Sequence, residues 1–181
     1  MKYMMLFAIV GLLVAGCRYE SPFTTEHNIA IDSAVLGLWE ELKPDQGVEP
    51  KEDEQMMILK YSDTEYLIHY PTGKDGIYYR GYPIKIGGIS CVQLQIIGTD
   101  DGPPKKDETE LFHVVSYQLT DGQLEIKTLD TDLVNDDLKT TEELHKAFLK
   151  QKENKDLFKD PGVFRKKKLT SRMQATAYSR A

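Results

Sequence analysis

Apolar residues recur at every second position in several short runs between residues 55 and 130, which is the period of a half-buried β-strand. The clearest case is 91–96, where valine, leucine and isoleucine alternate with cysteine and glutamine, so one face is expected to be packed and the other wet. Residues 111–119 are apolar at odd and even positions alike, which predicts a strand covered on both faces. The expected strands lie at 34–42, 57–61, 66–70, 78–86, 91–96, 111–119, 124–127 and 163–164.

Turn-forming residues separate the expected strands and leave little room for helices between them. Residues 62–65, the Gly-Gly pair at 87–88 and the Asp-Gly pair at 121–122 each stand between two neighbouring strands. Glycine supplies the positive φ that tight hairpins require. The Asp-Pro-Gly sequence at 160–162 is expected to turn the chain into the last strand. Short strands joined in this way are typical of an antiparallel meander.

One helix is expected late in the chain. Thr140 precedes Glu143 by three residues, the spacing of a capping box, and Leu144, Ala147 and Phe148 then fall on one helical face. We expect this apolar stripe to pack on the sheet. The sequence therefore predicts a mainly β fold, an antiparallel meander curled into a barrel or half-barrel, with one C-terminal helix packed on it.

A different pattern occupies the N-terminus. Lys2 is followed by an apolar stretch from Met4 to Val14, and no further charge occurs before Arg18. This order of a basic residue, an apolar run and small residues is typical of a secretory signal peptide. The apolar run is shorter than the ~20 residues that a membrane-spanning helix needs, so we expect cleavage rather than a permanent span.

The end of this segment, Val-Ala-Gly-Cys at 14–17, resembles the lipobox of bacterial lipoproteins. The resemblance implies that residues 1–16 are removed and that Cys17 carries diacylglycerol and often a further acyl chain such as palmitate. Two or three acyl chains hold a protein at a membrane far longer than one. The alternative is an ordinary secreted protein in which Cys17 lies near the cleavage site by chance.

The same resemblance implies a place in the cell envelope. In diderm bacteria, aspartate after the lipidated cysteine is associated with inner-membrane retention, and here the residue is Arg18. The resemblance therefore implies the outer membrane, facing the periplasm, in a diderm cell, and otherwise the outer face of the cytoplasmic membrane.

These patterns divide the chain into four parts and leave one cysteine without a disulfide partner. The parts are a cleaved signal peptide (1–16), a lipidated cysteine with a flexible tether (17–31), a single β-rich domain (32–164) and a basic, disordered tail (165–181). With Cys17 lipidated, Cys91 has no disulfide partner, so it is expected to be a small buried side chain.

Charge is unevenly distributed along the chain. The formal net charge is -6, but six basic residues and no acidic one follow Phe164. The acidic body argues against nucleic acid as a partner, because like charges repel. The basic tail has two interpretations: contact with an anionic surface, or a solvated end that folds back against the acidic body.

Gly37-Leu38-Trp39 resembles the G-x-W motif that opens the first strand of lipocalins, and a meander followed by a late helix is similar to their order of elements. The resemblance implies a barrel that encloses a cavity for a small apolar molecule. It also implies that Trp39 closes the floor of that barrel as a packing residue.

Few residues are arranged for catalysis or metal binding. The sequence contains no P-loop, H-E-x-x-H, G-x-S-x-G or C-x-x-C motif. His69 and His113 would form a metal or hydrolytic site only if the fold brought them together, and ordinary strand histidines are the preferred interpretation. The acidic cluster at 130–137 lacks the glycine and the terminal glutamate of a calcium loop, so a solvated loop is expected. We expect no cofactor, no metal and no enzymatic activity.

Five tyrosines crowd into residues 66–82 on adjacent expected strands. Tyr66, Tyr70, Tyr78 and Tyr82 are the candidate ligand-binding residues, since tyrosine gives contact area at small entropic cost and a hydroxyl that orients a ligand. The alternative is a mixture of core and rim positions, because strands favour tyrosine in any case.

Taken together, these patterns predict a membrane-anchored, non-catalytic binding or interaction module, with a small apolar ligand or a protein as its partner. One alternative is a structural role in assembly beside another envelope protein, which predicts a flat exposed apolar patch. Another is a hydrolase whose site is assembled from scattered histidine and acidic residues.

Overall fold

The computed structural model describes residues 18–42, 55–73, 75–109 and 111–167. The residues of the predicted signal peptide, and Cys17 with its predicted lipid, therefore lie outside the described residues. The described elements are η1 (Ser33–Val35), β1 (Gly37–Glu41), β2 (Gln55–Lys60), β3 (Tyr66–Tyr70), β4 (Ile77–Ile86), β5 (Ile89–Thr99), β6 (Phe112–Thr120), β7 (Gln123–Leu129), α1 (Thr141–Gln151) and β8 (Phe158–Lys166).

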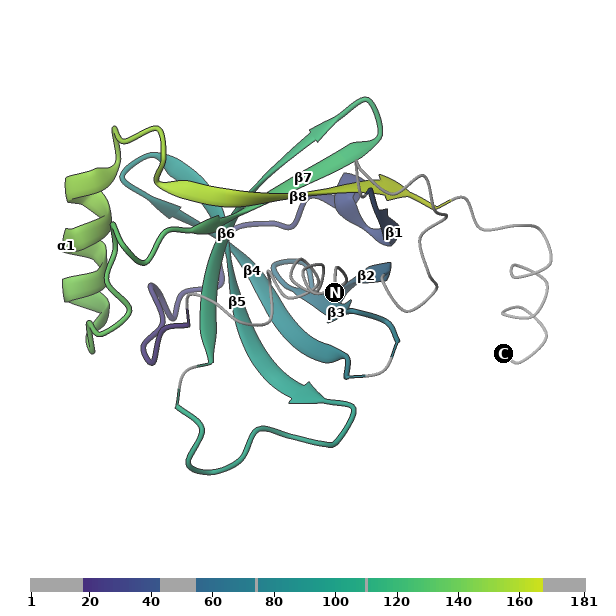
Figure 1. Cartoon of the computed structure of the whole chain (residues 1–181), viewed down its shortest axis with the longest axis horizontal. Coiled ribbons are helices and arrows are strands. Elements are labelled where there is room, and N and C mark those ends of the chain that lie inside the picture. The colour runs from purple at the N-terminus through teal and green to yellow at the C-terminus, as the bar shows by residue number, and fades with distance from the viewer. Residues whose placement is uncertain (1–17, 43–54, 74, 110, 168–181) are drawn as a thin grey trace, which may run out of the picture.

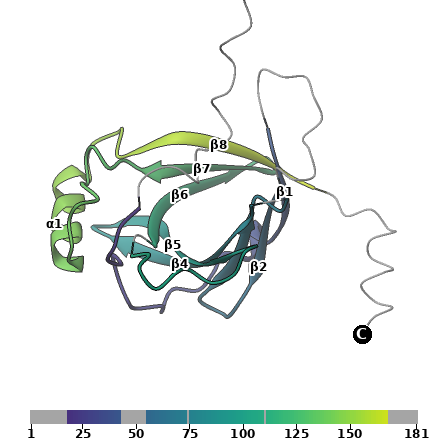
Figure 2. The same ribbon diagram turned by 60° about the horizontal axis from the view of Figure 1, so that its bottom comes forward.

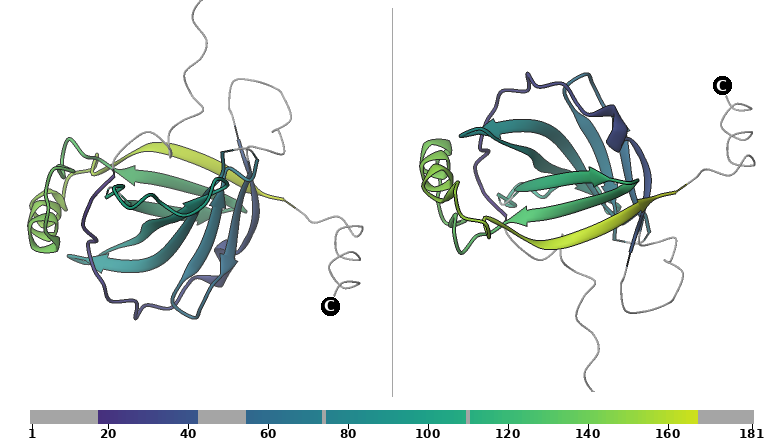
Figure 3. Two further views of the ribbon diagram at one scale, coloured as in Figure 1. Left: turned by 90° about the horizontal axis from the view of Figure 1, so that it is seen from below. Right: turned by 90° about the horizontal axis from the view of Figure 1, so that it is seen from above.

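The eight strands form one closed antiparallel barrel. Each strand pairs with the next along the chain, and β8 pairs with β1 to complete the ring, which is visible in Figures 2 and 3. Helix α1 lies outside the ring (Figure 1). The predicted antiparallel meander with one C-terminal helix packed on it is confirmed, and the barrel is closed.

Tight turns with positive φ make two of the hairpins. Asp121 and Gly122, with φ of 51° and 77°, join β6 to β7, and Gly87 and Gly88, with φ of 58° and 93°, join β4 to β5. Positive φ at both central residues is the requirement of a type I′ turn, whose twist matches that of the paired strands. The hairpin predicted at Asp121-Gly122 is confirmed, and β4 ends at Gly87-Gly88 as predicted.

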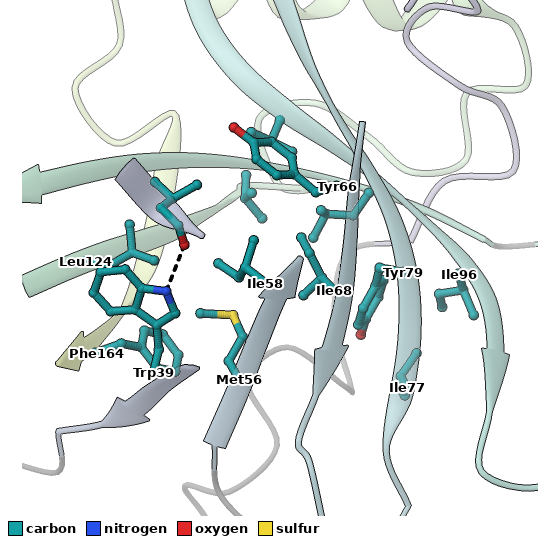
Figure 4. Packing of buried hydrophobic residues seen from close by; sticks show 14 residues of the cluster. Trp39, Met56, Ile58, Tyr66, Ile68, Ile77, Tyr79, Ile96, Leu124 and Phe164 are labelled. Carbon is teal, nitrogen blue, oxygen red and sulfur yellow. Dashed lines mark hydrogen bonds between the residues drawn. The ribbon is translucent and has the colours of Figure 1, made fainter. Parts of the chain in front are cut away.

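The barrel interior is filled by side chains from alternate strand positions, as the strand period requires (Figure 4). On β5 these are the apolar residues of the predicted alternation, Val92, Leu94 and Ile96. We call this cluster the inner core. Its other buried members are Val35, Trp39, Met56, Ile58, Tyr66, Ile68, Ile77, Tyr79, Val115, Leu124 and Phe164.

A second cluster, the outer core, lies between the outside of the barrel and the segments that cover it. Its buried members are Tyr19, Phe23, Tyr82, Ile84, Ile86, Cys91, Val114, Leu129, Val134, Leu144, Phe148 and Leu157.

The capping box predicted at the start of α1 is present: the Thr140 hydroxyl accepts from the Glu143 N–H, and the Glu143 carboxylate accepts from the Thr140 N–H. Among the described residues, no helix has the length and apolar character needed to span a membrane.

The outward face of β5 is buried at Cys91 and Gln93 rather than wet. The side chain of Gln93 has 0% of its surface exposed; its Oε1 accepts from the Phe23 N–H at 2.6 Å and its Nε2 donates to the Thr24 carbonyl at 3.2 Å. Cys91, on the same face, is buried in the outer core, as predicted. The prediction of a wet face is wrong because the covering segment comes from a distant part of the sequence.

Residues 19–23 belong to the folded domain and not to a flexible tether. The rings of Tyr19 and Phe23 are fully buried, and Tyr19 exchanges two backbone hydrogen bonds with Phe112, of 2.8 and 3.0 Å. The predicted tether at 17–31 and the predicted domain start at Asp32 are therefore wrong for this segment. Two isolated aromatic residues among polar ones show no strand or helix period, which is why the sequence pattern did not reveal them.

The last strand is longer than predicted. It contains the Asp-Pro-Gly sequence, which was expected to form a turn before the strand. Lys159 pairs with Thr128 and Gly162 with Ile126, so two residues of β8 oppose one of β7. Asp160 has a φ of 56°, as the extra residue of a β-bulge often requires. The expected turn at 160–162 is thus a bulge.

The predicted basic tail begins too early. Arg165 and Lys167 lie 3.2 Å from the carboxylate of Glu40, and Arg165 is part of β8. These basic side chains close the barrel seam between β8 and β1. Residues 168–181, the rest of the predicted tail, lie outside the described residues.

Candidate functional site

The tryptophan of the G-x-W sequence is held in the inner core by the short helix before it. Its indole N–H donates to the carbonyl of Val35, at the end of η1, at 2.8 Å (Figure 4). Nζ of Lys166 lies 5.3 Å from the centre of the Trp39 ring and donates to the Ala34 carbonyl at 3.0 Å. Trp39 therefore joins η1, β1 and β8, which is a packing role.

An apolar cavity of about 60 Å³ remains inside the barrel. Most of its lining is aliphatic, from residues that include Met56, Ile58, Leu94, Val115 and Leu124. An apolar cavity of about 150 Å³ is enough to hold benzene, and a cavity takes a water molecule only when polar groups can bind it. The cavity as it stands therefore accommodates only a few non-hydrogen atoms.

Two polar atoms of the lining have no hydrogen-bond partner among the described residues: the Tyr79 hydroxyl and Nε2 of His113. Both residues are only 3% exposed, and their rings meet edge to face with centroids 5.9 Å apart. A buried polar group without a partner costs free energy, of order 1–3 kcal/mol, so such groups are rare. This pair is the chemically distinctive feature of the cavity.

Burial keeps both groups neutral. It lowers the pKa of His113 from 6.5 to about 4 and raises the pKa of Tyr79 from 10 to about 12, while the guanidinium of Arg18 lowers both pKa values. At neutral pH the cavity therefore presents an uncharged imidazole and an uncharged phenol. Such a pair can hydrogen-bond to a hydroxyl, carbonyl or other neutral polar group.

Three further tyrosines line the cavity, Tyr66, Tyr70 and Tyr117, and their hydroxyl groups are partnered; that of Tyr70 donates to the Glu41 carboxylate at 3.1 Å. The Tyr66 hydroxyl accepts from the Asp32 N–H at 2.7 Å, and the Tyr117 hydroxyl donates to the Asp32 carboxylate at 3.4 Å. In Figure 4 the hydroxyls of Tyr66 and Tyr79 point toward opposite sides of the view. The unpartnered Tyr79 hydroxyl thus lies apart from the Tyr66 hydroxyl and its Asp32 partner.

The structure divides the four tyrosines predicted to bind a ligand. Tyr66 and Tyr70 line the cavity. Tyr78 and Tyr82 lie on the outside of β4: Tyr78 stacks on His69 with centroids 4.1 Å apart, and Tyr82 is buried in the outer core. Only the first two are therefore placed to touch a molecule inside the barrel.

Tyr79, His113 and Tyr117 are the lining residues with a polar group that the sequence prediction of ligand-binding residues missed; it also named none of the aliphatic lining residues. The signal for Tyr79 was present, because it shares a strand face with Ile77. However, the opposite face of β4 carries more apolar residues, and both faces of this strand are covered. Periodicity alone does not tell the inside of a barrel from a covered outside.

The two candidate histidines do not form a joint site. His113 points into the barrel, whereas His69 stacks on Tyr78 outside it, with Nε2 3.8 Å from the carboxylate of Asp100. Their strands, β3 and β6, are not neighbours in the barrel. In the described part of the chain, no group of three or more histidine, cysteine or acidic residues is arranged to hold a metal ion.

Two aspartates of the acidic loop before α1 are paired with one lysine. Nζ of Lys159 lies 2.6 Å from the carboxylate of Asp130 and 3.2 Å from that of Asp132. These ion pairs raise the pKa of Lys159. Asp130 is buried, so the expectation of a solvated loop is wrong for this residue, because a lysine from β8 provides its counter-charge.

A second buried charge lies outside the barrel, where the N-terminal segment crosses β4. The carboxylate of Glu65 lies 2.6 Å from the Arg80 guanidinium and 2.5 Å from Nδ1 of His27. Arg80, and to a smaller extent His27, lowers the pKa of Glu65 against the opposing effect of burial. The His27 ring also packs on Tyr82, so this cluster holds the N-terminal segment against the barrel.

No protein-family model matches the chain, and no curated protein or solved structure is significantly similar to it. The interpretation of the cavity therefore rests on its own geometry and chemistry.

The buried, neutral state of His113 predicts a specific loss of stability in acid. Because its folded pKa of about 4 lies below its ordinary value of 6.5, the unfolded chain binds the proton more readily. The contribution of neutral His113 to the free energy of unfolding is complete above pH 6.5. About 3 kcal/mol of it is lost as the pH falls toward 4. Urea unfolding from pH 7 to pH 4 should show this loss for wild type relative to His113→Gln. Parallel curves for the two proteins would contradict the prediction.

Proposed function

We propose that the protein is a lipid-anchored envelope protein whose barrel binds the apolar part of a small amphipathic molecule. The observation that carries this proposal is the apolar cavity lined by Tyr79 and His113, each of which has a buried polar atom without a partner. An entirely apolar void would lower stability without offering any orientation to a ligand. Two unsatisfied hydrogen-bonding groups give a ligand both a binding surface and a preferred direction.

The chemistry of the lining selects the class of ligand. The walls are apolar, so an alkyl or alicyclic part of the ligand would be buried there. His113 and Tyr79 are neutral at pH 7, so they favour an uncharged polar group such as a hydroxyl or carbonyl. This proposal includes no covalent chemistry by the protein.

The size of the cavity limits the part of the ligand that enters. Its volume of about 60 Å³ accepts a short alkyl group, and a longer group requires side chains to move. Met56 is the lining residue best suited to such movement, because methionine is unbranched and has three rotatable bonds.

Tyr79→Phe is expected to weaken ligand binding and to stabilise the free protein at the same time. The change removes one hydrogen bond to the ligand, for an affinity loss of about 5- to 10-fold. It also removes a buried hydroxyl that has no partner in the free barrel, so the free energy of unfolding should rise by about 1 kcal/mol. Binding can be followed with 1-butanol, 1-hexanol and 1-octanol by the NMR shifts of the Val92, Leu94 and Val115 methyl groups.

Tyr78→Phe is the matched control, because the neighbouring tyrosine of β4 lies outside the barrel and its hydroxyl is 3.4 Å from a carboxylate oxygen of Asp100. This variant should bind the alcohols as wild type does. Equal loss of affinity in the two variants, or no methyl shifts with any alcohol, would sink the proposed binding function.

A further inference from the structure

We infer that the barrel is held with the Tyr79 and His113 end of its cavity toward the bilayer. This inference rests on the proposed function, because it requires a lipid on Cys17. Its new content is the surface that meets the membrane, which is the β5–β6 connection at residues 100–109.

The attachment point is close to the folded body. Tyr19 is only two residues beyond Cys17, and a fully extended chain spans at most ~3.6 Å per residue. Tyr19 is fully buried and paired with Phe112 at the start of β6. A lipid on Cys17 therefore reaches the membrane from a point within roughly 7 Å of the first fixed residue.

That fixed residue cannot swing away from the barrel without losing several contacts. The Tyr19 hydroxyl donates to the Val134 carbonyl at 2.8 Å, and its ring packs edge to face on Phe23 with centroids 5.1 Å apart. Gln93 then holds the backbone of Phe23 to β5. The direction in which the anchor leaves the domain is consequently set by the fold.

The anchor leaves the domain at the end that carries the unpartnered polar atoms. Arg18, the residue after Cys17, lies 3.6 Å from the carboxylate of Glu108 in the β5–β6 connection. Arg18 also lowers the pKa values of Tyr79 and His113, so its charge lies near both. His113 is the second residue of β6, directly after Phe112, the partner of Tyr19.

The β5–β6 connection and the β6–β7 hairpin lie at opposite ends of the barrel, at the bottom and top of Figure 1. An anchor beside Phe112 brings the first of these ends to the membrane and keeps the second away from it. Lys105 and Lys106 are exposed in the connection, where lysine can contact lipid phosphate groups. The connection also carries four acidic residues, Asp100, Asp101, Asp107 and Glu108. Attachment to the same membrane keeps this surface at high effective concentration despite that charge.

The test uses the full-length lipidated protein in phosphatidylcholine vesicles. A fluorophore is attached at Lys106→Cys or, as the matched control, at Asp121→Cys in the exposed β6–β7 hairpin. Vesicles containing a lipid with a headgroup spin label then quench whichever fluorophore lies near the surface. We expect at least about threefold stronger quenching at position 106 than at position 121, because the label at 106 faces the bilayer.

A spacer variant tests the cause of this orientation. Ten Gly/Ser residues inserted between Arg18 and Tyr19 have a root-mean-square span of roughly 17 Å, so quenching at position 106 should fall to the level at position 121. Equal quenching at both positions in protein that floats with vesicles overturns the orientation and leaves the anchor intact. Protein that does not float with vesicles overturns the anchor, and the orientation with it.

Discussion

Replacing Cys17 by alanine is expected to abolish incorporation of radioactive palmitate. The physical reason is that the lipid is attached through the sulfur of Cys17, which alanine lacks, and each buried CH₂ of an acyl chain stabilises membrane attachment by ~0.8 kcal/mol. Labelling of cells that produce wild type or Cys17→Ala, followed by isolation of the protein, measures this effect.

Cys91→Ala is the matched control for this experiment. Cys91 is the other cysteine of the chain; it is buried, and burial raises the pKa of its thiol to about 12, so it is unsuited to modification. The Cys91 variant should keep full palmitate label. An unlabelled wild type, or a labelled Cys17→Ala protein, would show that the lipobox resemblance is misleading.

Trp39→Ala is expected to cause the largest loss of stability of any single substitution considered, about 4 kcal/mol in the free energy of unfolding. The indole is fully buried, donates to the Val35 carbonyl and lies under the Lys166 ammonium group. Truncation leaves a hole and an unpaired carbonyl in the inner core. A loss of this size is a large part of the 5–15 kcal/mol that stabilises ordinary domains. Urea unfolding followed by circular dichroism measures it without needing tryptophan fluorescence.

Two variants test whether the loss of stability in Trp39→Ala comes from the packing of the indole or from a general sensitivity of the protein to mutation. Trp39→Phe keeps an aromatic ring but loses the indole N–H, so it should fall between wild type and alanine in stability. Tyr61→Ala removes a side chain that is 63% exposed and should change the free energy of unfolding by less than about 1 kcal/mol. A Trp39→Ala protein as stable as Tyr61→Ala would contradict the packing role.

The cavity lining and the segments that cover the barrel from outside pack on the same strands, β4, β5 and β6. Each of these strands contributes buried residues to both clusters, the inner core on one side and the outer core on the other. Gln93 on β5 holds the N-terminal segment, while Leu94 beside it lines the cavity. The part of the barrel that carries Tyr79 and His113 is therefore the part that residues 19–23 stabilise from outside.

Local signals in the sequence were sufficient for much of the fold. The Asp121-Gly122 and Gly87-Gly88 pairs specify their hairpins, because each turn depends on the φ values of its own two residues. Thr140 and Glu143 likewise cap their helix through contacts only three residues apart. Such signals act within a few residues, which is why they can be read without knowing the tertiary structure.

The candidate site depended on contacts that no local pattern contains. A period of two separates the faces of β4, placing Tyr78 on one and Tyr79 on the other, but the inside of the barrel is defined only when β8 pairs with β1. The Asp160 bulge similarly requires its partner strand. The burial of Tyr19 and Gln93 requires the N-terminal segment to pack across β5.

By itself, therefore, the sequence determined the meander, its tight turns, the capped helix and the alternation of each strand, because these follow from interactions between near neighbours. The tertiary structure alone decided which strand faces line the cavity, that Tyr79 and His113 meet there without partners, and that residues 19–23 are part of the domain. The reason is that burial is a property of contacts between segments far apart in the chain, and those contacts exist only once the barrel has closed and been covered.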